Sequence, residues 1–253
     1  MARSVLITAG ASGIGREFVR AFSASGDKIF VCDIDAGALK LLKDEIPAIA
    51  THVCDLAKRT EIETMVTEGV RMLGGFDILI NNAGIAGPTA PVDEIDPAEW
   101  DKVMQIDLTA TFDVTRLLVP YLKKSGAGSI INMSSMAGRF GYENRSPYST
   151  AKWGIIGFTK TLSIELGKYD IRVNAILPGP VEGERMDRVL EGRAKISGRS
   201  VQEEKQNALS LQSIKQFVDP RDIAALAVFL ASDNAKMISG QLFPIDGDIQ
   251  KAS

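Results

Sequence analysis

Short apolar runs alternate along this chain with longer stretches of helical length, and this alternation limits the fold more than any other sequence feature. The predicted strands are residues 5–9, 29–33, 49–54, 76–80, 129–133, 172–177 and 241–245. The predicted helices are residues 13–26, 36–46, 58–73, 97–124, 147–169 and 219–232. Because a helix can cross over between parallel strands, this order predicts an α/β fold, a doubly wound parallel sheet with helices on both faces.

The predicted elements form one unit, because no repeat, low-complexity tract or flexible linker interrupts residues 1–253. A length of 253 residues with 45% hydrophobic side chains suits a single α/β domain. The least regular segments are residues 82–96 and 178–218, and residues 182–212 form the predicted substrate lid. Pro244 has no N–H to donate, so we expect the last strand at an edge of the sheet.

Charge and rare side chains exclude several classes of function. A net charge of -3 without a basic stripe argues against a nucleic-acid partner. His52 is the only histidine, so a Ser-His-Asp triad and a His-rich zinc site are excluded, and we expect no metal. Cys32 and Cys54 lie in apolar runs, which predicts buried thiols without a disulfide. With no stretch long enough to span a membrane, we expect a soluble cytoplasmic protein.

A glycine-rich turn joins the first predicted strand to the first predicted helix. Its glycines, which allow a helix N-terminus to approach a pyrophosphate, are Gly10, Gly13 and Gly15. Asp33 ends the next strand, about twenty residues on, where a carboxylate binds ribose hydroxyls and repels a 2′-phosphate. Ser12, Ile34 and Asp35 offer no cation to that phosphate, and Arg16 fits a solvated first turn equally well. The pattern predicts NAD, with a turn that binds no ligand as the alternative.

Tyr148 and Lys152 lie four residues apart at the start of a predicted helix and therefore share one face. Ser135 lies at the end of the fifth predicted strand. Alcohol oxidation requires a base that removes the hydroxyl proton while a hydride leaves carbon. Tyr148 suits this task if the Lys152 ammonium stabilises its phenolate. Taken alone, such a pair is more often an amphipathic surface pair.

From about residue 3 to 248, the ordered motifs resemble the short-chain dehydrogenase/reductase family. The resemblance is carried by the turn Thr8 to Gly15, by Asn81-Asn82-Ala83-Gly84, by Ser135 with Tyr148-x-x-x-Lys152, and by Pro178-Gly179-Pro180-Val181. Two positions depart from the family pattern: Ala9 replaces a usual glycine, and Gly183 replaces a frequent threonine. The resemblance implies a Rossmann-type domain that binds a dinucleotide and forms a homotetramer.

The resemblance also implies roles for individual residues. Ser135 would hold the substrate oxygen, Tyr148 would transfer the proton, and Lys152 would also hydrogen-bond the nicotinamide ribose. Asn81 would brace the central sheet. The implied cofactor-binding residues are Gly10, Ser12, Gly13, Ile14, Gly15, Asp33, Ile34, Asp55, Leu56, Asn82, Ala83, Gly84, Tyr148, Lys152, Pro178, Gly179 and Val181.

Asp107 takes the position of the family's fourth catalytic residue, which is normally Asn. An ionised Asp has nearly the same size but only accepts hydrogen bonds, so it could hold a water molecule while adding negative charge near Lys152. That charge would offset part of the lysine's effect on the Tyr148 phenolate, so we expect the oxidative rate profile to shift toward higher pH. The alternative is that Asp107 turns away or pairs with another group at a helix kink.

Together these features predict an NAD-dependent oxidoreductase that acts on a secondary alcohol or ketone, with a small polar substrate such as a sugar, polyol or hydroxy acid. An NADP-dependent 3-oxoacyl-type ketone reductase of the same fold is the first alternative. The second is a dinucleotide-sensing binding protein, which the intact Ser135, Tyr148 and Lys152 argue against. The lid arginines could bind an acidic substrate, but we expect a solvated face, because Glu184 and Arg188 stand at i,i+4.

Overall fold

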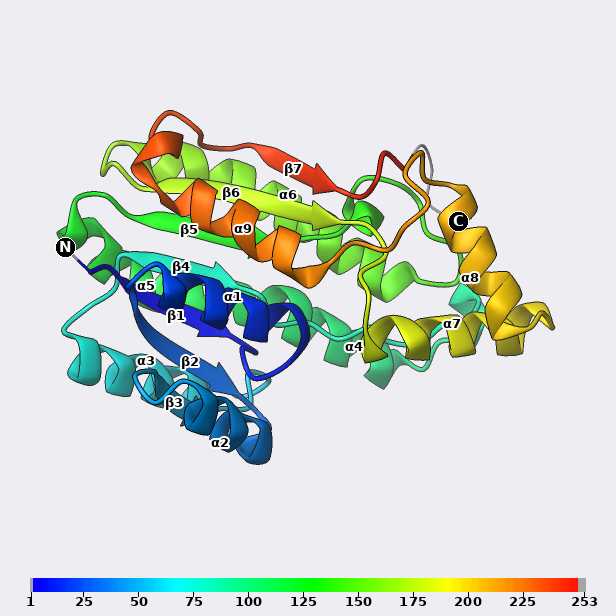
Figure 1. Ribbon diagram of the computed structural model, residues 1–253. Helices are drawn as coiled ribbons and strands as arrows, with labels where there is room; N and C mark the ends of the chain where they lie inside the picture. The colour runs from blue at the N-terminus through cyan, green and yellow to red at the C-terminus, as the bar shows by residue number, and fades with distance from the viewer. Residues whose placement is uncertain (1, 250–253) are drawn as a thin grey trace.

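One sheet of seven parallel strands forms the centre of the molecule (Figure 1), with the strand order β3-β2-β1-β4-β5-β6-β7. The computed structural model describes residues 2–249. The strands are β1 (Ser4–Thr8), β2 (Lys28–Asp33), β3 (Ala50–Val53), β4 (Ile78–Asn81), β5 (Ser129–Met133), β6 (Arg172–Pro178) and β7 (Leu242–Ile245). The predicted fold class and all seven predicted strands are confirmed.

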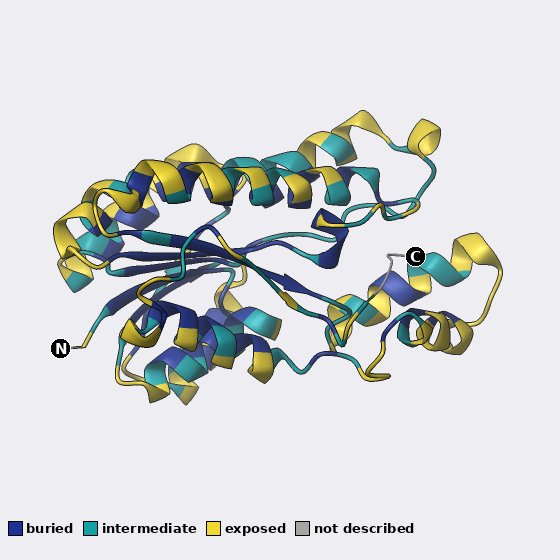
Figure 2. Ribbon diagram, turned by 90° about the horizontal axis from the view of Figure 1, so that it is seen from above, coloured by how far each residue is buried: buried dark blue, intermediate teal, exposed yellow. Residues whose placement is uncertain are grey.

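Helices cover both faces of the sheet, because strand side chains alternate between two apolar cores. The helices are α1 (Gly13–Ala24), α2 (Ala36–Glu45), α3 (Arg59–Leu73), α4 (Pro97–Met104), α5 (Ala110–Ser125), α6 (Ser146–Gly167), α7 (Glu184–Ser197), α8 (Val201–Ser210) and α9 (Pro220–Ala231). Ile7 belongs to the core that also contains buried residues of α1, α2 and α9, whereas the neighbouring Leu6 belongs to the core with buried residues of α3, α5 and α6. Figure 2 shows the buried strands between two helix layers whose outer faces are exposed.

The helix predicted over residues 97–124 is not continuous. A five-residue π-helical turn, Gln105–Thr109, lies between α4 and α5, and the Ala110 N–H donates to the Gln105 carbonyl. The wider turn contains one more residue than an α-helical turn, a feature that the apolar spacing does not reveal. The predicted lid, residues 182–212, contains the helices α7 and α8.

Strand β7 lies at an edge of the sheet, as its proline predicted, and Pro244 pairs in register with Leu177 of β6. Both cysteines are buried free thiols, in agreement with the sequence. Over residues 2–249, the structure has no helix that is long and apolar enough to cross a membrane.

A chain of buried polar side chains joins two strands and two helices at the centre of the molecule. The Asn81 amide on β4 donates to the Asn132 side-chain oxygen on β5 at 2.8 Å and to the Thr115 hydroxyl on α5 at 3.0 Å. The Asn132 amide donates to the Thr159 hydroxyl on α6 at 2.9 Å. The expected bracing role of Asn81 matches these bonds, which fix α5 and α6 against the sheet.

We predict that Asn132→Ala lowers the free energy of unfolding by about 2–4 kcal/mol, because buried partners lose their hydrogen bonds and a cavity forms. Urea denaturation at fixed protein concentration measures the change. Asn234→Ala, at an exposed position, is the control and should change stability by less than about 0.5 kcal/mol. A loss no larger than that of the control would show that the buried bonds are not stabilising.

Candidate active site

The glycine turn lies between β1 and α1, at the carboxyl end of the sheet. A Cβ on Gly10 would lie 2.2 Å from the Val31 side chain, and one on Gly15 would lie 2.1 Å from the Ala9 carbonyl oxygen. Only glycine therefore lets the chain pass this closely at these two positions. Ala9 itself has a φ of 50°, in the left-handed region that ordinarily favours glycine.

Asn82 fixes this turn to strand β4. Its side-chain amide donates to the carbonyls of Thr8 and Ala9 at 3.1 and 2.9 Å. The Thr8 hydroxyl in turn accepts hydrogen bonds from the backbone N–H groups of Asn82 and Ala83. The side chain expected to approach a cofactor therefore holds the loop that would bind one.

Asp33 ends β2 beside this turn, and backbone amides hold its carboxylate. The N–H of Ala11 donates to Oδ2 at 3.0 Å, and the N–H of Asp35 donates to Oδ1 at 3.1 Å. Ile34 is 66% exposed just beyond it. Asp55, with the buried Leu56, follows β3 next to the end of β2. A tight glycine turn followed by a fixed carboxylate fits the pyrophosphate and ribose of a nicotinamide dinucleotide.

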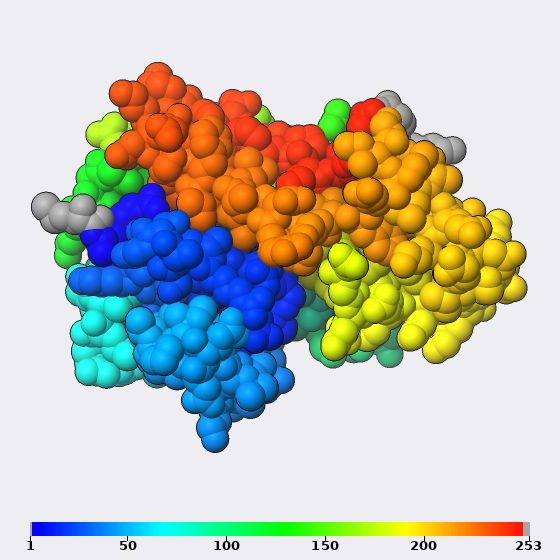
Figure 3. All heavy atoms as spheres, viewed as in Figure 1, coloured from blue at the N-terminus to red at the C-terminus, as the bar shows by residue number. Residues whose placement is uncertain are grey.

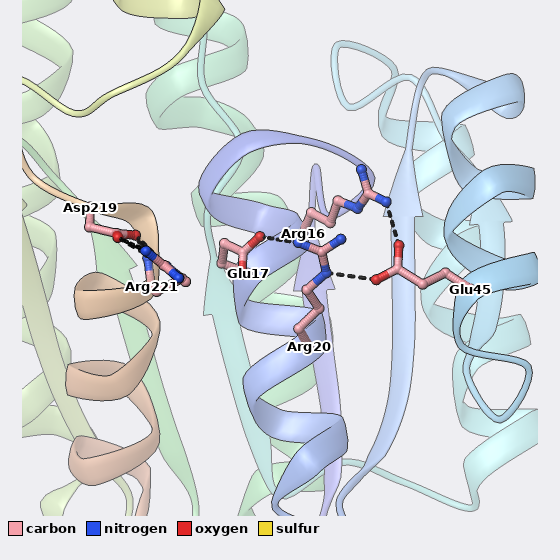
Figure 4. Close-up of polar contacts among 6 residues, drawn as sticks. All are labelled: Arg16, Glu17, Arg20, Glu45, Asp219 and Arg221. Atoms are coloured by element: carbon pink, nitrogen blue, oxygen red, sulfur yellow. Dashed lines mark hydrogen bonds and ion pairs between the residues drawn. The ribbon is translucent and has the colours of Figure 1, made fainter.

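Arg16, the cation nearest to the turn in sequence, is engaged elsewhere (Figure 4). Arg16 and Arg20 on α1 both donate to the carboxylate of Glu45 at the end of α2. The hydrogen bonds from Arg20 and Arg16 lower the pKa of Glu45 to about 2, so its negative charge persists at neutral pH. Arg16 therefore has a counter-ion, a partner that the sequence did not reveal.

The family's signature residues lie at the same end of the sheet. Ser135 follows β5, and its hydroxyl accepts a hydrogen bond from the Ala137 N–H at 3.2 Å. Tyr148 and Lys152 lie on the first turns of α6, with the Lys152 Nζ 5.5 Å from the centre of the Tyr148 ring. Lys152 is only 3% exposed and donates to the Met133 carbonyl at 3.2 Å. The fold thus brings the three residues together.

The Tyr148 phenol has a pKa below its ordinary value of 10.0, the result of opposing effects. Burial of the phenol raises the pKa. The positive charges of Arg185 and Lys152 lower it, and so does a hydrogen bond from Ser135. The negative charge of Asp107 raises it. The lowering effects dominate, which favours proton transfer nearer to neutral pH.

Asp107 lies in the π-helical turn and is completely buried. Its Oδ1 accepts a hydrogen bond from the Ile85 N–H at 2.7 Å, and its Oδ2 lies 3.3 Å from the Lys152 Nζ. A Cβ on Gly84 would lie 3.1 Å from both of these side chains, so the backbone passes directly against the pair. Features of both alternatives for Asp107 are therefore present: it pairs with a backbone amide at a helix irregularity, and its other carboxylate oxygen faces Lys152.

The last group of expected cofactor residues follows β6. The Gly179 N–H donates to the Ile245 carbonyl at 2.9 Å, and a Cβ on Gly179 would lie 2.9 Å from the Cα of Asp246. Pro178 is buried at the end of the strand, and Val181 forms a bridge with Val218. These residues lead directly into α7, so the segment after β6 connects the sheet to the predicted lid.

Helices α7 and α8, the predicted lid, stand beyond the carboxyl ends of the strands (Figure 1). Figure 3 shows the surface hollowed between the blue residues near α1 and the yellow residues of this segment. A further cavity of about 330 Å³ is lined by Thr89, Asn144, Arg193 and residues of α8. Arg145 was not among the site residues predicted from the sequence, whereas Arg185 is one of the lid arginines considered for an acidic substrate. The guanidinium carbons of Arg145 and Arg185 lie 5.3 and 5.7 Å from the centre of the Tyr148 ring. Arg185 and Arg188 are both exposed, as expected for a solvated face; Arg188 pairs with Glu184 at 3.9 Å, whereas Arg185 also lies against the Tyr148 ring.

Known proteins resemble this chain over nearly its whole length. Residues 8–248 match the family model described as enoyl-(acyl carrier protein) reductase. The D-beta-hydroxybutyrate dehydrogenase of Cupriavidus necator is 36% identical over 97% of this chain and 96% of that protein.

Two similar solved structures hold different nicotinamide cofactors. A variant of the actinorhodin polyketide ketoreductase with NADPH has a TM-score of 0.93 and 30% identity, covering 97% of this chain and 96% of the other. An NAD+-bound xylitol dehydrogenase has a TM-score of 0.93 and 28% identity, covering 97% and 98%. The motifs, the fold and these matches agree: the chain belongs to the short-chain dehydrogenase/reductase family and is an oxidoreductase that uses a nicotinamide dinucleotide.

Proposed function

We propose that this protein oxidises the hydroxyl of a small polar substrate with NAD, producing a ketone. The observation that carries the proposal is the grouping of Ser135, Lys152 and a Tyr148 whose pKa is lowered by its neighbours. Similarity to a D-beta-hydroxybutyrate dehydrogenase and a xylitol dehydrogenase supports a hydroxy acid, polyol or sugar. The cytoplasmic location and the homotetramer stay predictions.

In the oxidative direction, the Tyr148 phenolate accepts the proton of the substrate hydroxyl. The Ser135 hydroxyl donates a hydrogen bond to the substrate oxygen and so fixes it beside the phenol. Bound NAD supplies the carbon that accepts the hydride. A positioned base of this kind contributes about 10²- to 10⁴-fold to the rate. In the reductive direction, the neutral phenol returns the proton as a general acid.

Lys152 assists the base by its charge. Its ammonium lies 5.5 Å from the Tyr148 ring centre, where it favours the phenolate. Asp107 lies behind the ammonium at 3.3 Å and opposes this effect. We propose that the two side chains together set the pH range over which Tyr148 works as a base.

The preference for NAD is argued from the end of β2. The fixed Asp33 carboxylate would accept hydrogen bonds from the ribose hydroxyls, whereas a 2′-phosphate would bring like charges together. Arg16, the cation nearest in sequence, is paired with Glu45. An NADP-dependent ketone reductase would need a cation here to offset the charge of Asp33.

We predict that the purified protein binds NAD more tightly than NADP. Asp33→Ala should lower the ratio of the NADP to the NAD dissociation constant about tenfold or more, because a like-charge contact is removed. Fluorescence titration with both cofactors measures the two dissociation constants. Asp35→Asn is the matched control, since Asn retains the helix cap that Asp35 provides at Ala38. Tighter binding of NADP by the unchanged protein would overturn the assignment.

Tyr148→Phe should reduce turnover by about 10³-fold or more, because it deletes the proton-transfer group and leaves the pocket nearly unchanged. Binding of NAD should remain within about twofold, since little cofactor contact is lost. Initial rates and a binding titration on the same preparation separate the two effects. Tyr169→Phe, on a partly exposed ring, is the control. Undiminished turnover in Tyr148→Phe would show that another residue is the base.

Asp107→Asn should move the pH profile of oxidative turnover to lower pH. Asp107 raises the pKa of Tyr148, so removing its charge lowers that pKa and allows the phenolate to form at lower pH. Matched profiles of kcat/KM test the direction, with Asp101→Asn on the exposed face of α4 as the control. An unchanged profile with an unchanged rate would remove Asp107 from the mechanism.

A further inference from the structure

A buried arginine lies against Tyr148 and has only neutral hydrogen-bond partners. Arg145 is 2% exposed, and its guanidinium donates to the Ala86 carbonyl at 2.6 Å and to the Thr89 hydroxyl at 3.3 Å. Its buried Nε has no hydrogen-bond partner. Within residues 2–249, no carboxylate forms an ion pair with it. A buried charge normally has a counter-ion, and the described part of the chain supplies none for this guanidinium.

A second guanidinium approaches the same ring from the lid. Arg185, on the first turn of α7, places its guanidinium carbon 5.7 Å from the centre of the Tyr148 ring. In the described part of the chain it also has no ion-pair partner, although Arg188 on the same helix pairs with Glu184. Arg185 is exposed, so it is accessible to a molecule that enters beneath the lid.

We propose that Arg145 and Arg185 form a subsite for the carboxylate of the substrate, so that this enzyme oxidises a short hydroxy acid. The inference rests on the function proposed above, because it narrows the substrates of the same Tyr148 site. Arg145 would supply a fixed, buried charge beside the Tyr148 ring, and Arg185 would complete the subsite from α7. Guanidinium groups suit this role because they bind carboxylates in a planar, bidentate geometry.

The charges around the pair support an anionic ligand. Burial lowers the pKa of Arg145, and the positive charges of Arg185 and Arg193 lower it further, against the opposing effects of Tyr142 and Tyr148. An anion held between the guanidinium groups would relieve both the desolvation and the repulsion. Among the acids close in sequence to the two arginines, Glu143 lines the neighbouring cavity and Glu184 pairs with Arg188, and neither forms an ion pair with Arg145.

The geometry also limits the length of the substrate. Both guanidinium carbons lie close to the ring whose phenolate oxygen accepts the proton, at 5.3 and 5.7 Å from the ring centre. A carboxylate bound to them therefore lies only a few bonds from the carbon that is oxidised. A 2- or 3-hydroxy acid satisfies this spacing, whereas a long acyl chain would place its charged end elsewhere.

Two probes with the same carbon skeleton test the charge. Oxidation of 3-hydroxybutyrate is compared with oxidation of butane-1,3-diol at the same carbon, and the measured quantity is the ratio of their kcat/KM values. We expect the acid to be favoured and R185Q to lower the ratio about 10- to 100-fold, the range of a charged hydrogen bond. The ratio cancels the effect of Arg185 on Tyr148, which acts on both substrates.

R188Q is the matched control, since it removes one positive charge from the same helix without a contact to Tyr148. A ratio near one in the unchanged protein, or an equal fall in R185Q and R188Q, would overturn the subsite. R145Q removes the buried charge and R145K keeps it, and thermal denaturation shows whether each variant is folded. Among folded variants, we expect R145K to keep the kcat/KM ratio that favours the acid and R145Q to lose it.

A binding measurement separates this inference from the proposed reaction. Butyrate has the carboxylate but no hydroxyl, so calorimetry on the complex with NAD reports the subsite without turnover. We expect butyrate to bind and R185Q to weaken it. If butyrate binds through Arg185 while no alcohol is oxidised, the subsite stands and the proposed reaction fails. If butyrate does not bind, the subsite is wrong whatever the turnover.

Discussion

The burial of one ammonium group is the constraint on which the active end of this molecule depends. Lys152 is 3% exposed, so its charge needs partners within the protein. It finds them in the Met133 carbonyl at the end of β5 and in the Asp107 carboxylate on the π-helical turn. Strand β5, the helix α6 and the turn between α4 and α5 must therefore meet at one point. Gly84 allows this meeting, because a larger residue there would press on both charged groups.

The sequence was sufficient for the sheet and for the helices that cross over between its strands. Apolar runs and helical spacing report burial, and burial in a doubly wound sheet follows the strand order closely. The π-helical turn at 105–109 could not be predicted in this way, because one extra residue changes the backbone without changing the apolar pattern. The lid helices α7 and α8 were also less evident, since few of their side chains are buried.

The site residues also differ in how far the sequence could place them. Residues adjacent in a motif, such as Tyr148 and Lys152, could be placed from spacing, because one helix fixes their relation. Arg145 and Arg185 are forty residues apart, and only the folded chain brings their guanidinium groups to one ring. Charge signs alone favoured a solvated lid face, and both Arg185 and Arg188 are exposed; the approach of Arg185 to Tyr148 is the part that the charge pattern does not reveal. Long-range convergence carries no local signal in a single sequence.

The edge strand β7 has a consequence for how two copies of this chain can meet. The carbonyls of Gln241 and Ile245 accept hydrogen bonds from β6, so the backbone groups of the odd-numbered residues of β7 point toward β6. The backbone of Pro244 therefore faces the open edge. A neighbouring strand would find no N–H at that position to continue the ladder. Two molecules therefore cannot extend each other's sheet without interruption along this edge, which favours association through side-chain packing over continuous strand pairing.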